Sequence, residues 1–272
     1  MNKKTKTNPK MFYFFFFIIA CLFVVAIEEK FAAIHIREHT EKNYRKVSEL
    51  AARKITTLID EKKNATLGIA LALAQTGSVQ RALAVCDPLG LDLSQFSLLL
   101  RRETSFKNVW IQIVDKEGKS FYRSWTDAHG DDLRKIRTDV CRMASNPGAT
   151  TAISVGKFDI AIKAMAPVYD SGGAFLGFLE IITHFNSIAE NLKSEGFETV
   201  ILVHKKYKNQ IRFPFTDKFV GQYYVANKNA PQYLLDHIQA TGVDLFFNQS
   251  STYRIDTPIG SLVILYTLLM VL

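Results

Sequence analysis

Residues 109–126, VWIQIVDKEGKSFYRSWT, decide the fold class of this chain. Val109 to Val114 is rich in β-branched and aromatic residues and predicts a β-strand. The segment Asp115–Gly118 predicts a tight turn, and Lys119 to Thr126 predicts the partner strand of a hairpin. Apolar residues recur at helical spacing before this hairpin, and more strand patterns follow it. We therefore expect an α+β fold.

The stretch before the hairpin predicts one helix from Glu28 to about Gln75. It contains no proline and a single glycine, Gly68, and its apolar residues recur at helical spacing. At 1.5 Å per residue this helix is about 70 Å long, more than a small domain can bury. We interpret residues 28–76 as a stalk that forms a homodimer with a second copy of the chain; a lone helix covering a sheet is the alternative. The expected pairing residues are Val47, Leu50, Ala51 and Leu58.

Turn residues separate the elements that follow the hairpin. A helix is expected at Asp132–Ser145, because acids stand at its positive end and Asn146-Pro147-Gly148 closes it. Pro231–Thr241 predicts a second helix, with proline at its first position. The predicted strands are Thr151–Val155, Phe158–Pro167, Ala174–His184, Thr199–His204, Gly221–Ala226, Tyr253–Asp256 and Ile259–Tyr266.

The N-terminal segment 11–27, MFYFFFFIIACLFVVAI, has no charged residue. Its 17 residues make about 25 Å of helix, close to the hydrocarbon thickness of a bilayer. Four lysines and no acid precede it, which predicts a cytoplasmic tail at residues 1–10. We expect a transmembrane anchor in the inner (cytoplasmic) membrane and a periplasmic or extracellular domain; a cleaved signal peptide is the alternative. Residues 268–272 are interpreted as the start of a second transmembrane helix.

The charge distribution argues against a nucleic-acid ligand, and the cysteine spacing argues against a cysteine metal site. A net charge of +8 could indicate a nucleic-acid ligand, but the cationic residues are spread along the chain, so no nucleic-acid binding is expected. The three cysteines lack the C-x-x-C spacing of a metal site. Cys21 lies in the apolar segment. Cys86 and Cys141 are therefore either disulfide-bonded or, as we favour, two separate buried thiols.

Three segments carry a resemblance to a known family. Residues 106–125 (FKNVWIQIVDKEGKSFYRSW), 166–170 (APVYD) and 177–182 (GFLEII) look like the double Cache sensor modules of bacterial chemoreceptors, sensor histidine kinases and diguanylate cyclases. The resemblance implies PAS-like antiparallel sheets, with the long N-terminal helix on one face and a ligand pocket on the other. It also implies a membrane-distal domain over residues 77–190 and a smaller membrane-proximal domain over residues 191–267.

Strand alternation places several polar and aromatic side chains on shared faces. An arginine can hold a carboxylate with two hydrogen bonds, a lysine adds positive charge, and a glutamate can accept from an ammonium group. Such a face suits a small anionic or zwitterionic ligand. The candidate contacts are Phe121, Arg123 and Trp125 on one strand, Asp159 and Lys163 on another, and Glu180 and His184 on a third.

Arg123-Ser124-Trp125 also matches the R-x-W spacing of amino-acid-binding Cache domains. In that family the arginine binds the ligand carboxylate. Thr126 stands where the family has a tyrosine, and Ile182 where it has an acid, so the resemblance leaves the ligand open between an amino acid and another carboxylate.

Structural roles are the alternatives for these residues. Arg123 can pair with Glu180 on a solvated face, and Trp125 can belong to a core. Lys163 can face solvent, and His184 can be a hydrogen-bonding residue at a strand end.

Enzyme signatures are absent from the sequence. It contains no G-x-S-x-G, H-E-x-x-H, P-loop or G-x-G-x-x-G motif. The acidic segment 127–132, DAHGDD, lies between a predicted strand and helix, where a turn and an N-cap explain it better than a metal site. We expect the sensing region of a transmembrane receptor, with no cofactor and no catalytic activity. A membrane-anchored extracytoplasmic hydrolase is the alternative.

Overall fold

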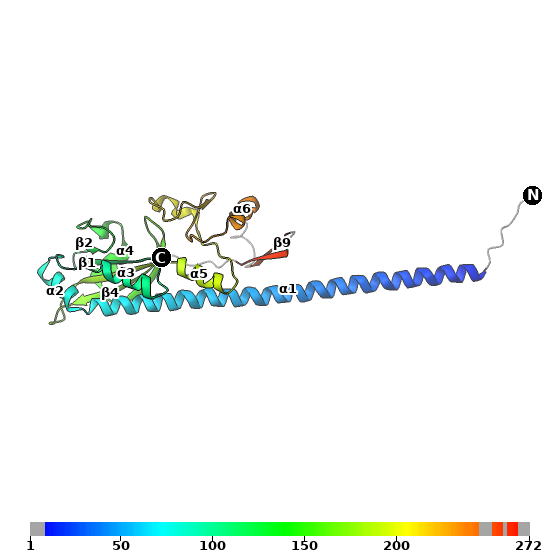
Figure 1. Cartoon of the computed structure of the whole chain (residues 1–272), viewed down its shortest axis with the longest axis horizontal. Helices are drawn as coiled ribbons and strands as arrows, with labels where there is room; N and C mark the ends of the chain where they lie inside the picture. Colours follow the sequence, from blue (N-terminus) through cyan, green and yellow to red (C-terminus); the bar gives the residue numbers. More distant parts are fainter. Residues whose placement is uncertain (1–8, 245–251, 258–259, 266–272) are drawn as a thin grey trace, which may run out of the picture. The chain divides into compact units, whose positions relative to one another are not determined.

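The computed structural model describes residues 9–244, 252–257 and 260–265 (Figure 1). The chain divides into two compact units, one with the residues up to Leu50 together with Thr252–Leu265, and one that begins at Ala51. Helix α1 (Pro9–Ala74) runs through both units without interruption. The predicted long N-terminal helix is therefore confirmed, and it includes the apolar segment 11–27.

The first unit contains the N-terminal part of α1 and a two-stranded hairpin. β9 (Thr252–Thr257) and β10 (Gly260–Leu265) pair antiparallel, so the predicted hairpin at this place is confirmed. Among the described residues, a search for a helix both long and apolar enough to cross a bilayer found none. The segment 268–272, interpreted as the start of a second transmembrane helix, lies outside the described residues.

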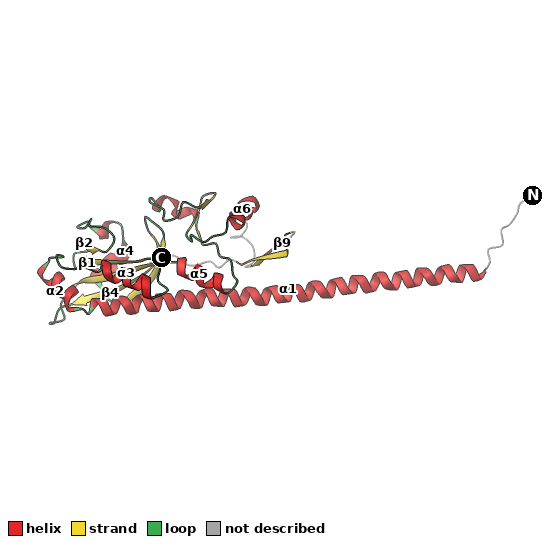
Figure 2. Cartoon of the chain, viewed as in Figure 1, coloured by secondary structure: helices red, strands yellow, loops and turns green. Residues whose placement is uncertain are grey.

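The second unit is built on a five-stranded antiparallel sheet with the strand order β2-β1-β5-β4-β3. The predicted hairpin supplies β1 and β2, and the three later strands form as predicted, with ends shifted by up to two residues (Figure 2). The strands are β1 (Val109–Asp115), β2 (Ser120–Arg123), β3 (Thr150–Val155), β4 (Ile160–Tyr169) and β5 (Phe175–His184).

One face of this sheet is covered by helices. The last turns of α1 together with α2 (Gly77–Val85) pack there, and α3 (Ser94–Glu103) lies against β1. Ile111, Ile113 and Ile181 have no solvent exposure in this core, and each contributes about 1.5–3 kcal/mol of stability by burial. Two polar contacts join α1 to the end of β5 and to the helix that follows it: Thr66 with Thr183 at 3.3 Å, and the Lys62 ammonium donating to the Ser187 hydroxyl.

On the opposite face of the sheet, the helix predicted at Asp132–Ser145 forms only in its C-terminal part. A 3-10 turn, η1 (Leu133–Lys135), is followed by a break, and α4 (Thr138–Ser145) begins only at Thr138. Asp132 caps η1 as predicted, accepting a hydrogen bond from the Arg134 amide at 3.1 Å. The break gives Arg137 an extended backbone (φ −135°, ψ 105°), so its side chain points toward the sheet instead of following a helix.

A smaller module follows the sheet within the second unit. It has a three-stranded sheet with the order β6-β8-β7. The strand predicted at Thr199–His204 is only two residues long, and the one predicted at Gly221–Ala226 is a short hairpin that turns at Gly221. The elements are α5 (Asn186–Ser194), β6 (Leu202–Val203), η2 (Lys205–Gln210), β7 (Phe219–Val220), β8 (Tyr223–Val225) and α6 (Gln232–Thr241).

The expected pairing surface of α1 needs two corrections. Ala51 is buried, at 5% exposure, so it is not free to contact a second copy. Leu58 packs with Ile59 and Tyr224 in a core of its own chain, so it is not free to contact a second copy. Val47 and Leu50 are exposed, at 49% and 58%. Pairing of two chains through these two residues remains a prediction.

The prediction of buried thiols is wrong. Cys21, Cys86 and Cys141 are free and exposed. Cys86 ends α2 in the left-handed conformation (φ 56°), which turns the chain away from the helix and leaves the thiol on the surface.

Gly177 allows a close approach of β5 to the backbone of β1. Its φ is +149°, and a Cβ atom there would lie 2.3 Å from the carbonyl oxygen of Val114. We expect Gly177→Ala to lower the free energy of unfolding by about 1–3 kcal/mol, because neighbouring backbone must shift. Urea denaturation measures this. The matched control is Gly68→Ala in α1, where no atom lies within 4 Å of the added Cβ; it should stabilise the protein by about 0.5–1 kcal/mol. Equal effects of the two substitutions would contradict the packing argument.

Candidate functional site

A cavity of about 690 Å³ lies on the face of the five-stranded sheet opposite α1. Its floor is formed by β1, β2, β4 and β5, one wall by the segment from η1 to α4, and the other by the loops before β4 and after η2. The lining is both cationic and aromatic. The size and the mixed lining are typical of a small-molecule site.

Arg137 and Glu180 form a buried ion pair at this cavity. Glu180 has no solvent exposure, and the Arg137 guanidinium donates to both of its oxygens, with Nη1 2.8 Å from Oε2. Arg137 also donates two hydrogen bonds to Asp139, at 2.7 and 3.1 Å. Burial alone would raise the pKa of both carboxyl groups, but Arg137 holds each pKa below its usual value. Both acids are therefore ionised and already paired.

Lys163 lies on β4 beside this pair and faces the cavity. Burial and the neighbouring Arg137 lower the pKa of its ammonium group, although Glu180 and Asp139 oppose that shift. Among the described residues, no hydrogen bond or salt bridge involves its Nζ. The Lys163 side chain is half-buried and has no direct partner among the described residues, so its charge favours an incoming anion.

Arg123 enters the cavity from the end of β2. It donates to the carbonyl oxygen of Ala128 and to the carboxylate of Asp131, each at 2.9 Å. The Asp131 pKa is lowered, because this pairing outweighs burial. The alternative that Arg123 pairs with Glu180 is therefore wrong. Its ion-pair partner is Asp131, in the loop that follows β2.

Aromatic rings form one side of the cavity. Trp110 and Trp125 stack with their centroids 5.0 Å apart, and the Phe158 ring meets Trp110 edge-on at 5.2 Å. His184 packs between Trp110 and the stacked ring of Phe215, and its Nδ1 lies 3.5 Å from the Asn108 carbonyl oxygen. Burial lowers the His184 pKa to about 4, so this histidine is neutral at pH 7.

Asp159 is almost fully buried, with 2% exposure, at the start of β4. One carboxyl oxygen accepts from the Ile160 amide at 2.7 Å. Burial raises the Asp159 pKa to about 8, against the opposing effects of the Ile160 amide and the Tyr224 hydroxyl. The group is therefore mostly protonated at pH 7.

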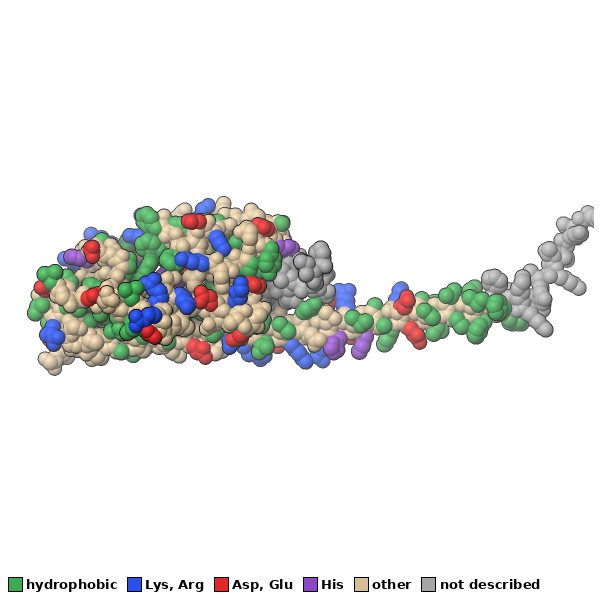
Figure 3. Space-filling model, in the orientation of Figure 1, with side chains coloured by type: hydrophobic (Ala, Val, Ile, Leu, Met, Phe, Trp, Pro, Cys, Tyr) green, Lys and Arg blue, Asp and Glu red, His purple; other side chains and the backbone are tan. Residues whose placement is uncertain are grey.

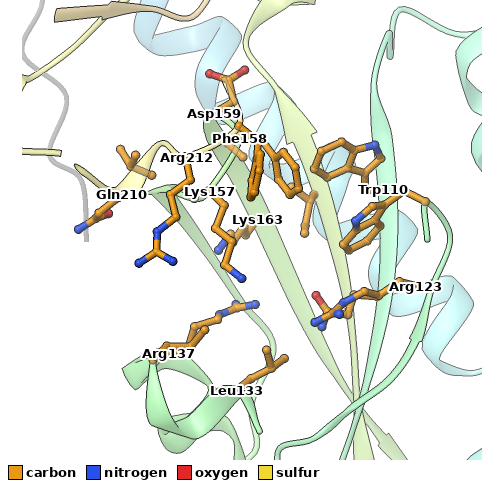
Figure 4. Close-up of a pocket in the computed structure, with 18 of the residues that line it drawn as sticks. Trp110, Arg123, Leu133, Arg137, Lys157, Phe158, Asp159, Lys163, Gln210 and Arg212 are labelled. Atoms are coloured by element: carbon orange, nitrogen blue, oxygen red, sulfur yellow. The ribbon is translucent and has the colours of Figure 1, made fainter. Parts of the chain in front are cut away.

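Two cations at the cavity rim were not among the candidates from the sequence. Lys157 precedes β4, and Arg212 follows η2; the Arg212 amide donates to the Lys157 carbonyl oxygen at 2.8 Å, which brings the two loops together. Figure 4 shows the charged ends of Lys157, Arg212, Arg123 and Arg137 turned toward a common space, with the Asp159 carboxyl group pointing away from it. No local sequence signal marks Arg212, because its place depends on contacts with residues far away in the chain.

Five of the seven candidates from the sequence line this cavity: Arg123, Trp125, Asp159, Lys163 and His184. Glu180 lies behind Arg137. Phe121 is on the other face and packs on the core under α1, so the expectation that it shares a face with Arg123 is wrong. The cause is a β-bulge: Tyr122 pairs with Ile113 and Ser120 with Val114, and the extra residue between them reverses the alternation.

Comparison with protein families gives one match. Residues 44–243 match the dCache_3 model, described as the double sensory domain of two-component sensor kinase. This range contains the five-stranded sheet, the cavity and the smaller module. A comparison with curated proteins gave no match.

Comparison with solved structures gives partial matches at low sequence identity. The Escherichia coli DcuS sensor domain is 16% identical, with 49% of this chain and 96% of that chain covered and a TM-score of 0.41. The Vibrio cholerae LuxQ periplasmic domain is 16% identical (57% and 74% covered, TM-score 0.39). The ligand-binding domain of the Pseudomonas aeruginosa amino acid chemoreceptor PctB, solved with L-Gln, is 14% identical (61% and 68% covered, TM-score 0.34).

Proposed function

The chain belongs to the dCache_3 family of double sensory domains, and from this premise we propose that it is the extracytoplasmic ligand-sensing region of a membrane receptor. The ligand is a small anion or zwitterion, such as a carboxylate or an amino acid. It binds in the cavity on the sheet face opposite α1. The observation that carries this proposal is the convergence of cationic side chains from four parts of the chain on one concave space lined by aromatic rings (Figure 4). A sensory family does not support the hydrolase alternative.

Arg123 and Lys163 are the proposed contacts for the anionic group, and Trp125 is the proposed wall. Arg123 offers a planar fork that suits a carboxylate. Its carbon atom Cζ also lies 6.0 Å from the centre of the Trp125 ring. His184 is a supporting residue for this wall, since it packs edge-on to Trp110.

The relay to the membrane is proposed to run through β5 and α1. Ile182 and His184 face the cavity, and Thr183 between them contacts Thr66 of α1 on the other face. A shift of β5 on ligand binding is therefore transmitted to the helix. Exposed aromatic and aliphatic side chains gather on the N-terminal part of α1 (Figure 3), which supports its role as an anchor. A ligand shifts this arrangement only if it binds one state better than the other.

A thermal-shift screen of the full chain with small carboxylates, amino acids and amines tests this function. Arg123→Ala should weaken binding of the best hit by about 1.5–3 kcal/mol, the cost of a lost hydrogen bond to a charged group. The matched control is Arg102→Ala on α3, whose side chain is 75% exposed and pairs with Glu103; binding should stay unchanged there. Binding that survives unchanged in the Arg123 variant would place the ligand elsewhere, and the absence of any hit would refute a sensor for small anions or zwitterions.

A further inference from the structure

We propose that the cavity selects a ligand with two negative charges and no ammonium group, such as a short dicarboxylate, over the amino acid of the same skeleton. This inference rests on the proposed function and narrows its ligand class. It follows from the charges that face the cavity and from the partners that those charges already have.

The cavity has a surplus of positive charge. Its lining includes five cationic side chains, which are Arg123, Arg137, Lys157, Lys163 and Arg212. Three ionised carboxylates are close enough to offset them: Asp131 on Arg123, and Asp139 and Glu180 on Arg137. Two positive charges are therefore left over. His184 is neutral because of its burial, and Asp159 carries little charge at pH 7.

The surplus charges come from two sides of the cavity. Lys163 projects from the sheet at the floor, whereas Lys157 and Arg212 stand on loops at the rim. Figure 4 shows the rim cations turned toward the space above the Arg137 guanidinium. Among the described residues, no hydrogen bond or salt bridge involves the side-chain nitrogens of Lys163 or Arg212. Two anionic groups on one ligand can therefore be held from opposite sides.

Among the described residues that line this cavity, no carboxylate is both ionised and free of a cationic partner, so none can offset the charge of an ammonium group. Glu180 has no solvent exposure and is fully used by Arg137, and Asp139 accepts two hydrogen bonds from the same guanidinium. Asp131 is held by Arg123. Asp159 points away from the common space (Figure 4). An ammonium would be placed beside uncompensated cations, where like charges repel.

Matched pairs of ligands test the inference on the full chain. Malonate, succinate and glutarate are each compared with the 2-amino derivative and with the monocarboxylate of the same chain length (propionate, butyrate and valerate), by thermal shift and calorimetry. We expect at least one dicarboxylate to bind about tenfold or more tightly than both its amino counterpart and its monocarboxylate. An amino derivative that binds as tightly as its dicarboxylate would overturn the inference and leave the proposed function intact. No binding by any compound in the series or in the wider screen would refute both.

Two substitutions then locate the site. Lys163→Met and Arg212→Met should each weaken the best dicarboxylate about tenfold, with a smaller loss for the monocarboxylate, since one of two charge contacts is removed. Arg212 is exposed, so its variant keeps the test valid if the Lys163 variant folds poorly. Lys116→Met in the β1–β2 turn, 63% exposed, is the matched control. Unchanged affinity in both cavity variants would overturn the inference.

Discussion

Replacing Arg137 with methionine is expected to lower the free energy of unfolding by about 3–5 kcal/mol, because a buried carboxylate then loses its partner. Glu180 has no solvent exposure, and both of its oxygens accept hydrogen bonds from Arg137. Urea denaturation at pH 7 measures the loss. Arg142→Met on the exposed side of α4 is the matched control and should change stability by less than about 0.5 kcal/mol.

The double variant Arg137→Met, Glu180→Leu removes both charges of the ion pair, and so tests whether the loss in the single variant comes from the unpaired Glu180 carboxylate. Replacing both partners of a buried pair with apolar residues is often close to neutral, so the double variant should recover most of the loss.

The pH dependence of stability gives a second measurement. In the natural protein the Glu180 pKa is lowered, so its contribution to stability is lost as pH falls through that value. In the single variant burial should raise this pKa, and stability should increase as pH falls. A single variant with unchanged stability would show that the pair is not essential to the fold.

The sequence predicts the layout of the second unit well, because its signals are local. The turn at Asp115–Gly118 and the alternation in residues 109–114 give β1 and β2, and the glycines after Tyr169 mark the turn between β4 and β5. The long helix follows from the lack of proline. Each of these patterns depends on neighbours within a few residues, so each can be interpreted without the rest of the fold.

The site is predicted less completely, because it depends on exceptions to regular periods. The single-residue bulge at Phe121 reverses the face of that side chain, and alternation alone cannot show it. The break before Thr138 releases Arg137 from a predicted helix and brings it to Glu180. Thr138-Asp139 is itself a helix-start signal, but it lies inside a longer helical pattern that conceals it. Arg212 reaches the cavity only through a contact between two loops.

Asp159→Asn is expected to stabilise the protein increasingly as pH rises from about 4 to about 8. Burial raises the pKa of this carboxyl group from its ordinary value of 3.8 to about 8 in the folded protein. The folded state must therefore hold a proton that the unfolded state releases above pH 4, and this cost grows with pH until the folded group ionises. Each unit of pKa difference is worth about 1.4 kcal/mol, so the advantage of the variant should approach an upper limit of about 6 kcal/mol above pH 8. Paired melting curves from pH 5 to pH 9 measure it. Parallel pH profiles would contradict a buried neutral Asp159.

Ligand affinity, measured in the natural protein and in the Asp159→Asn variant, tests whether the Asp159 proton affects binding in the cavity. An ionised Asp159 adds a negative charge near the bound anion, so affinity for a dicarboxylate should fall in the natural protein as pH rises through about 8. Lys163, whose pKa is lowered, is present in both proteins, so any effect of its titration is common to both. The difference between the two affinity profiles therefore isolates Asp159. A difference that is constant across this pH range would mean that the Asp159 proton does not affect the bound anion, and that the anion lies farther from the start of β4 than we propose.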